Sequence, residues 1–147
     1  MSSKRSALDD SPWFRGPDVP MSVIRRYADQ VSARFHPDKI ILFGSHAYGV
    51  PHADSDVDIL VVMPARNEID QAVRIDRVID PPFPVDLIVC SPRNIAWRLQ
   101  EGDSFLGEIM TRGKVLYEKA DGAMDTKGRI RLRRSQENRP RKRRTSR

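Results

Sequence analysis

Residues 39–63 of this chain read KIILFGSHAYGVPHADSDVDILVVM, and this stretch decides the fold. Lys39–Phe43 is a short apolar run rich in β-branched residues that ends at Gly44-Ser45, which predicts a buried strand entering a tight turn and a short helix. A loop follows over residues 49–54. Asp56–Met63 then predicts a second strand, which we expect to be buried on both faces because its apolar run is uninterrupted after Asp58.

The remaining elements are predicted outward from these two strands. On the N-terminal side, the apolar positions of residues 21–35 recur at the spacing of one helix face, and Pro37 follows where the helix ends. On the C-terminal side we expect, in order, a helix over 68–79, a strand over 85–90, helices over 92–100 and 104–110, and a last strand over 114–118. This order predicts an α/β (α+β) domain in which a small mixed β-sheet is flanked by helices.

Charge is distributed unevenly along the chain. The formal net charge is +6, yet residues 122–147 hold eleven Lys or Arg residues against two acids, so the rest of the chain is net acidic. We therefore expect three parts: a polar N-terminal segment over 1–19, in which 1–17 lack regular structure, a folded domain over 20–120, and a basic, disordered tail over 121–147.

Several classes of protein are excluded by composition. The longest apolar stretch, Ile59–Met63, is far shorter than the roughly 20 residues of a membrane span, and Met1–Asp10 has no apolar run of a signal peptide. Cys90 is the only cysteine, which excludes a disulfide framework and predicts a cytoplasmic protein. We expect Cys90 to be a small buried hydrophobic residue and Trp97 to pack in the core.

Gly44-Ser45 is the first candidate for function. Glycine lets a ligand approach the backbone, the start of a helix offers free N–H groups, and Ser45 adds a hydroxyl, so this corner suits a phosphate. An ordinary Gly-Ser turn is the alternative. A P-loop is excluded, because Val50-Pro51 stands where that motif needs Lys-Ser/Thr.

Three aspartates form the second candidate. Asp56 and Asp58 lie two residues apart at the start of a strand, which places both carboxylates on one face, where they repel each other unless a cation such as Mg²⁺ lies between them. A polar strand end is the alternative, while an EF-hand fails because Ile59 replaces its glycine. Asp86 lies within the strand over 85–90 and needs a cation, an arginine partner such as Arg74 or Arg77, or an edge position.

Taken together, these residues resemble a known family. The segments FGSHAYG (43–49) and DSDVDILVV (54–62) are similar to the signature of the DNA polymerase beta-like nucleotidyltransferases, and GKVLYE (113–118) is similar to that of their minimal bacterial members. The resemblance implies that Gly44 and Ser45 bind the NTP phosphates. It also implies that Asp56 and Asp58 hold two Mg²⁺ ions, and that Asp86 completes the second metal site and accepts the proton of the attacking hydroxyl.

One departure from the family pattern concerns cationic phosphate contacts. Many members have arginines after Gly-Ser where this chain has His46 and Tyr48. A cationic contact must then come from elsewhere, for example from Arg74 or Lys114. His46 itself either meets a phosphate or is an incidental loop residue.

The resemblance further implies a reaction and a partner. Minimal members are often encoded beside a helical HEPN-type protein in toxin–antitoxin pairs, and some transfer AMP to a tyrosine of that partner. We therefore expect a Mg²⁺-dependent transferase of AMP from ATP to a hydroxyl of a HEPN-type toxin, acting as its antitoxin. The alternatives are an aminoglycoside-type small-molecule acceptor, a binding-only antitoxin, and a nucleic-acid-binding protein that uses its basic tail.

Overall fold

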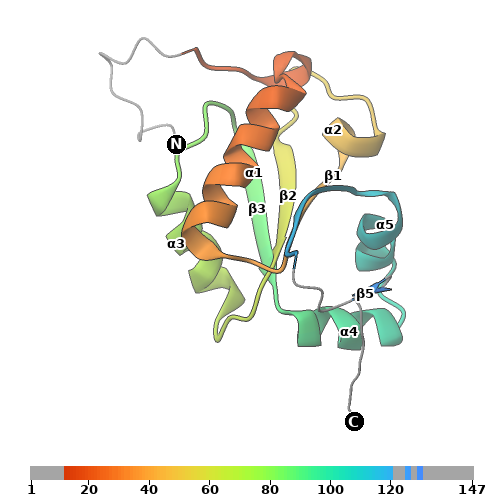
Figure 1. Cartoon of the computed structure of the whole chain (residues 1–147). Coiled ribbons are helices and arrows are strands. Elements are labelled where there is room, and N and C mark those ends of the chain that lie inside the picture. Colours follow the sequence, from red (N-terminus) through yellow and green to blue (C-terminus); the bar gives the residue numbers. More distant parts are fainter. Residues whose placement is uncertain (1–11, 121–124, 127–128, 131–147) are drawn as a thin grey trace. The chain divides into compact units, whose positions relative to one another are not determined.

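The computed structural model describes residues 12–120, 125–126 and 129–130 of the chain (Figure 1). Two compact units are distinguished, Met1–Tyr117 and Glu118–Arg147, and each is described by itself. In chain order the helices are η2 (Gly16–Asp18, a 3-10 helix), α1 (Met21–Phe35), α2 (Ser45–Tyr48), α3 (Glu68–Val78), α4 (Pro92–Gln100) and α5 (Ser104–Arg112). The strands are β1 (Lys39–Phe43), β2 (Val57–Val62), β3 (Val85–Cys90), β4 (Lys114–Glu118), β5 (Asp125–Thr126) and β6 (Arg129–Ile130).

Four strands form the central sheet, in the order β3-β2-β1-β4. Strands β1 and β2 pair antiparallel, with Phe43 opposite Asp58. Strands β2 and β3 pair parallel, with Asp58 opposite Asp86, and α3 makes the crossover that a parallel pair requires. The predicted fold class, a small mixed sheet flanked by helices, is therefore confirmed.

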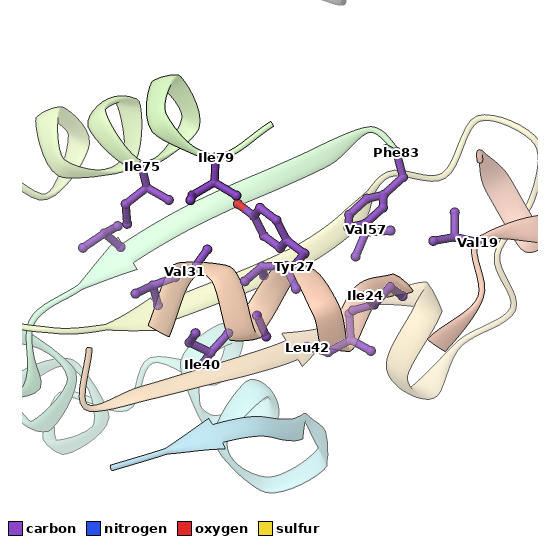
Figure 2. Close-up of a cluster of buried hydrophobic side chains, with 14 of the residues drawn as sticks. Val19, Ile24, Tyr27, Val31, Ile40, Leu42, Val57, Ile75, Ile79 and Phe83 are labelled. Carbon is purple, nitrogen blue, oxygen red and sulfur yellow. The ribbon is translucent and has the colours of Figure 1, made fainter. Parts of the chain in front are cut away.

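Helices cover both faces of this sheet (Figure 1). Alternate strand residues such as Leu42 and Ile59 point to the face that packs against α1 and α3, where Tyr27 and Phe83 meet edge to face with ring centroids 5.7 Å apart (Figure 2). The intervening residues, such as Leu60, point to the face that packs against α4 and α5. Successive side chains of β2 point to opposite faces, and both faces are apolar and buried from Ile59 to Val62, as predicted for the run after Asp58.

Most element bounds agree with the predictions, and the differences amount to one or two residues at an element's end. Strand β2 spans Val57–Val62 rather than Asp56–Met63, and α3 ends one residue early. Helix α5 continues to Arg112 and ends at Gly113, where the backbone becomes extended with φ −65° and ψ 159°. No helix of the described residues is both long and apolar enough to cross a membrane.

Two predictions were wrong. Residues 16–18 form η2, so the expectation that residues 1–17 lack regular structure is wrong at residues 16 and 17, while residues 1–11 lie outside the described part of the chain. Val19, in the segment expected to be polar, is buried in the core. A positive φ of 57° at Gly16 makes this turn possible. Trp97 is 59% exposed on α4 rather than packed in the core, whereas Cys90 is buried as predicted.

The prediction of a disordered basic tail falls mostly outside the described residues. Within the tail the structure describes only β5 and β6, which pair antiparallel, with Asp125 opposite Ile130 and Thr126 opposite Arg129. These four residues do have regular structure. For the remainder of residues 121–147 the prediction stands untested.

Candidate active site

Gly44 lies at the corner between β1 and α2 and has a backbone that other residues avoid. Its φ of 75° and ψ of −156° fall in a region that is essentially restricted to glycine. A Cβ added there would coincide with the Oδ2 atom of Asp58. Gly44 is therefore required both for the turn and for the close approach of the Asp58 carboxylate, a contact that the sequence did not indicate.

Ser45 is the first residue of α2 and is half-buried. Its carbonyl accepts a hydrogen bond from the Gly49 amide at 3.2 Å, which closes the short helix. Among the residues that the structure describes, its hydroxyl makes no hydrogen bond. The hydroxyl is thus available to a ligand beside the Asp58 carboxylate.

Asp58 and Asp86 lie side by side on the sheet. They are opposite each other in the parallel register of β2 and β3, so both side chains project from the same face, the one covered by α4 and α5. Phe43, on the other side of Asp58, extends this row onto β1. Asp56 is exposed and lies one residue before β2 begins.

The carboxylates act on one another electrostatically. The pKa of Asp58 is raised from 3.8 to about 6. Partial burial is the largest cause, the negative charges of Asp86 and Asp56 add to it, and nearby His46 acts in the opposite direction. The three aspartates predicted from the sequence are thus close enough to interact. Asp58 resists ionisation, because burial and the charges of its neighbours both disfavour a negative charge there.

This set of donors fits a hard divalent cation. Carboxylate oxygens are the ligands of Mg²⁺, and a cation would remove the repulsion that raises the pKa of Asp58. Within residues 12–120, 125–126 and 129–130, however, no three His, Cys, Asp or Glu side chains are already arranged to hold a metal ion. The aspartates are therefore neighbours that a cation would have to draw closer together.

The alternative roles suggested for Asp86 can now be compared. No ion pair joins Asp86 to Arg74 or Arg77 in the described part of the chain. Asp86 is exposed, and its strand β3 lies at the edge of the sheet. The edge position therefore explains how a carboxylate is accommodated within this strand, and it leaves the group accessible.

Arg74, suggested from the sequence as a phosphate contact, does not lie on the face of the sheet that carries the aspartates. It is carried by α3, which packs on the sheet face opposite to the Asp58 side chain. Arg112 of α5 lies on the correct side, with its guanidinium 4.5 Å from the centre of the Tyr48 ring and 2.9 Å from Glu108. Sequence reasoning missed Arg112, although its spacing of four residues from Glu108 is a recognisable helical ion pair.

Sequence reasoning also missed an exposed aromatic side chain near the carboxylates. Phe105 of α5 packs edge to face against Phe43, with ring centroids 5.7 Å apart, and remains 48% exposed. Since Phe43 is opposite Asp58 in the sheet, Phe105 presents an accessible ring beside the carboxylates. Only the packing of α5 against β1 reveals this proximity, because the two phenylalanines are far apart in the chain.

His46 has a structural partner and is not an incidental residue. Its Nε2 atom lies 2.8 Å from the carbonyl oxygen of Gly16, in η2. This contact joins α2 to the N-terminal segment of the chain.

Comparison with known proteins agrees with this geometry. The family model of the nucleotidyltransferase domain matches residues 24–113, which include Gly44, Ser45 and all three aspartates. The chain belongs to the nucleotidyltransferase domain family. No curated protein sequence matches it significantly.

Two solved structures are similar to this member of the family. One is a candidate nucleotidyltransferase from Sulfolobus solfataricus, with 21% identity and a TM-score of 0.48, where the match covers 69% of this chain and 83% of that one. The other is a mutant of the toxin–antitoxin MntA-HpeT, with 20% identity, a TM-score of 0.41, and coverage of 69% and 76%. At this level of similarity, neither indicates a substrate or a partner for this chain.

Proposed function

We propose that this chain is a Mg²⁺-dependent nucleotidyltransferase that transfers AMP from ATP to a hydroxyl group of a partner protein. The partner in this proposal is a helical HEPN-type toxin, and the chain acts as its antitoxin in the cytoplasm. The observation that carries the proposal is the row of Asp86 and Asp58 beside Gly44 in a chain of the nucleotidyltransferase family, with the pKa of Asp58 raised by burial and by the charges of Asp86 and Asp56.

The residues of this site have separate roles in the proposal. Asp56 and Asp58 would hold two Mg²⁺ ions, and Asp86 would complete the second metal site. Bound Mg²⁺ supplies positive charge that stabilises the triphosphate and the departing pyrophosphate. The Ser45 hydroxyl and the first amides of α2, which have no partner within the helix, bind phosphate oxygens.

Bond making and breaking occur at the α-phosphorus of ATP. The acceptor oxygen forms a bond to this phosphorus while the bond to the pyrophosphate oxygen breaks. Asp86 accepts the proton that the acceptor hydroxyl loses, a role to which its exposed position on an edge strand is suited. Phe105 offers a ring on which the adenine base can stack.

A protein acceptor rests on the family resemblance and on the accessibility of the carboxylates. Asp56 and Asp86 are both exposed, so that the hydroxyl of a macromolecule can reach them. Orientation of the acceptor contributes several kcal/mol to such a reaction. We therefore expect the chain alone to be slow, and transfer to become efficient when the partner is present.

The experiment that tests this function mixes the full chain with ATP labelled at the α-phosphate and with Mg²⁺. The acceptors compared are the helical protein encoded beside this chain, an aminoglycoside panel, and none. We expect label to be transferred to the protein, and to be lost with a chelator and in Asp86→Asn. Asp54→Asn is the matched control, because Asp54 is exposed in the loop before the site.

Three outcomes would contradict the proposal in different ways. Rapid labelling of an aminoglycoside by the chain alone would replace the protein acceptor with a small molecule. Tight binding of the helical partner without label transfer under any condition would leave a binding-only antitoxin. Undiminished transfer by the Asp56→Asn/Asp58→Asn double variant would refute the assignment of the metal ligands.

A further inference from the structure

The N-terminal segment, residues 12–20, contacts two regions that lie far from it in the chain. The amide of Phe14 donates a hydrogen bond of 2.8 Å to the carbonyl of Pro82, in the loop before β3. The carbonyl of Gly16 accepts a hydrogen bond of 2.8 Å from Nε2 of His46, in α2. A segment expected to be irregular is therefore attached both to the loop before β3 and to α2.

A third region packs directly against Gly16. A Cβ added to Gly16 would lie 2.9 Å from the carbonyl oxygen of His52 and 3.0 Å from the Cα atom of Ala53. Glycine is thus needed for this contact as well as for the positive φ of 57°. Figure 1 shows η2 against the loop that runs from α2 toward β2.

Each of these three regions lies close in sequence to a residue of the candidate site. His46 directly follows Ser45, the loop at 52–53 leads into Asp56, and the loop at 81–84 leads into Asp86. The second and third regions are also joined to each other, because the amide of Val57 donates to the carbonyl of Pro84 at 3.0 Å. The N-terminal segment therefore connects all the loops that position the site.

The segment is anchored in the core at its other end. Val19 is 8% exposed and belongs to the cluster around α1, and Figure 2 shows it near Val57 and Phe83. These two residues lie in β2 and in the loop before β3, respectively. The anchor thus holds the segment against the same two loops that Gly16 and Phe14 contact.

His46 is the only side chain found to bond this segment to α2 in the described part of the chain. Because a carbonyl only accepts, Nε2 carries a proton and donates it in this hydrogen bond. Nδ1 is buried, and no hydrogen-bond partner for it is found among the described residues. The ring is therefore committed to the Gly16 contact and does not face solvent as a free phosphate ligand would.

We propose that His46 is a positioning residue: through Gly16 it fixes the N-terminal segment across α2 and the two loops at 52–53 and 81–84, and so sets the relative positions of Ser45, Asp56 and Asp86. This inference rests on the proposed function for its consequence in catalysis, but the positioning itself is a property of the free protein. Loss of the His46 contact would loosen the loops and weaken the binding of Mg·ATP, while the chemical groups stay unchanged.

A matched pair of variants at His46 separates this role from general packing. Glutamine places an amide N–H group where Nε2 of histidine lies, whereas the shorter asparagine places its amide near Nδ1 and cannot reach Gly16. His46→Gln should therefore retain the contact, and His46→Asn should lose it. Gly16→Ala disrupts the contact from the opposite side, and Gly102→Ala is its control, because Gly102 also has a positive φ, of 87°, but no atom within 4 Å of an added Cβ.

The first measurement uses the full chain without nucleotide and requires no enzymatic activity. Hydrogen exchange is followed at the amides of Ser55 and Val57, which bond to His52 at 2.9 Å and to Pro84 at 3.0 Å. We expect exchange about tenfold faster in His46→Asn and Gly16→Ala, and within about twofold of the wild type in His46→Gln and Gly102→Ala. The second measurement is AMP transfer, where the KM for Mg·ATP should rise about tenfold in His46→Asn with little change in kcat, and be restored in His46→Gln.

The outcomes distinguish the two proposals. If the wild type transfers no AMP but exchange changes as expected, the positioning role stands and the proposed function fails. If the wild type transfers AMP while His46→Asn and Gly16→Ala leave both exchange and KM unchanged, the positioning role is overturned and the function stands. A His46→Gln variant as impaired as His46→Asn would also overturn it, because the histidine ring would then matter only for its shape.

Discussion

Replacing Asp58 with asparagine should stabilise the metal-free protein at neutral pH, although it removes a residue of the site. The pKa of Asp58 is raised from 3.8 to about 6 in the folded state, by burial and by the charges of Asp86 and Asp56. Above pH 6 the ionised carboxylate therefore opposes folding. Below about pH 4 it is protonated in both the folded and the unfolded chain, and the effect disappears.

The size of the effect follows from this pKa. A difference of one in pKa corresponds to about 1.4 kcal/mol, so that the upper limit is about 3 kcal/mol. Asp58 is only half-buried, and solvent screening reduces the expected gain in the free energy of unfolding to about 1 kcal/mol. For a domain of this size, a gain of about 1 kcal/mol raises the melting temperature by roughly 5 °C.

The assay is thermal unfolding of wild type and Asp58→Asn with a chelator, at pH 7.5 and at pH 4. The melting temperature of the variant should be higher at pH 7.5, and most of this difference should be lost at pH 4. Asp54→Asn, an exposed aspartate outside the row, should show no such difference. Added Mg²⁺ should stabilise the wild type more than the variant. A variant that is less stable than the wild type at pH 7.5 would refute the idea that these carboxylates repel each other in the folded protein.

Three further predictions concern other parts of the molecule. Gly44→Ala should lower the free energy of unfolding by about 2 kcal/mol and abolish AMP transfer, because the added Cβ would occupy the space of the Asp58 carboxylate. Gly102→Ala, whose Cβ meets only open space, should lower the free energy of unfolding by about 1 kcal/mol and remain active. Thermal unfolding and label transfer measure the two effects. Phe105→Ala should raise the KM for ATP about tenfold in steady-state assays, and Trp97→Ala, which removes an exposed aromatic residue of α4, should not; equal effects would exclude stacking on Phe105. Deletion of residues 122–147 should leave the melting temperature within about 2 °C of the wild type and reduce any salt-sensitive affinity for nucleic acid, so that a large loss of stability would show that the tail belongs to the folded domain.

The secondary structure could be predicted closely because its signals are local. The bounds of α1, β1 and β3 agree with the sequence prediction residue for residue. Their apolar periodicity and the prolines and glycines that end them act within a few residues along the chain. Trp97 shows the limit of such signals, because its exposure depends on what packs against α4 and not on the character of the residue itself.

The sequence indicated which residues belong to the candidate site but not how they are arranged. Gly44, Asp56 and Asp58 lie within one short stretch, where a turn and the alternation of a strand determine their proximity. The contact between Gly44 and Asp58 was invisible, because it depends on the antiparallel register of β1 and β2. The position of Arg112 over the Tyr48 ring was missed for a similar reason, since nothing local relates α5 to α2.

By itself, the sequence determined which segments are strands and helices, that the central strands are buried on both faces, and that two carboxylates stand at the start of one of them. Only the tertiary structure decided that β3 lies beside β2, which brings Asp86 opposite Asp58. It also decided that His46 meets Gly16, thirty positions earlier in the chain. The physical reason is that backbone conformation responds to neighbours along the chain, whereas strand order and such distant contacts depend on how the whole chain buries its apolar surface.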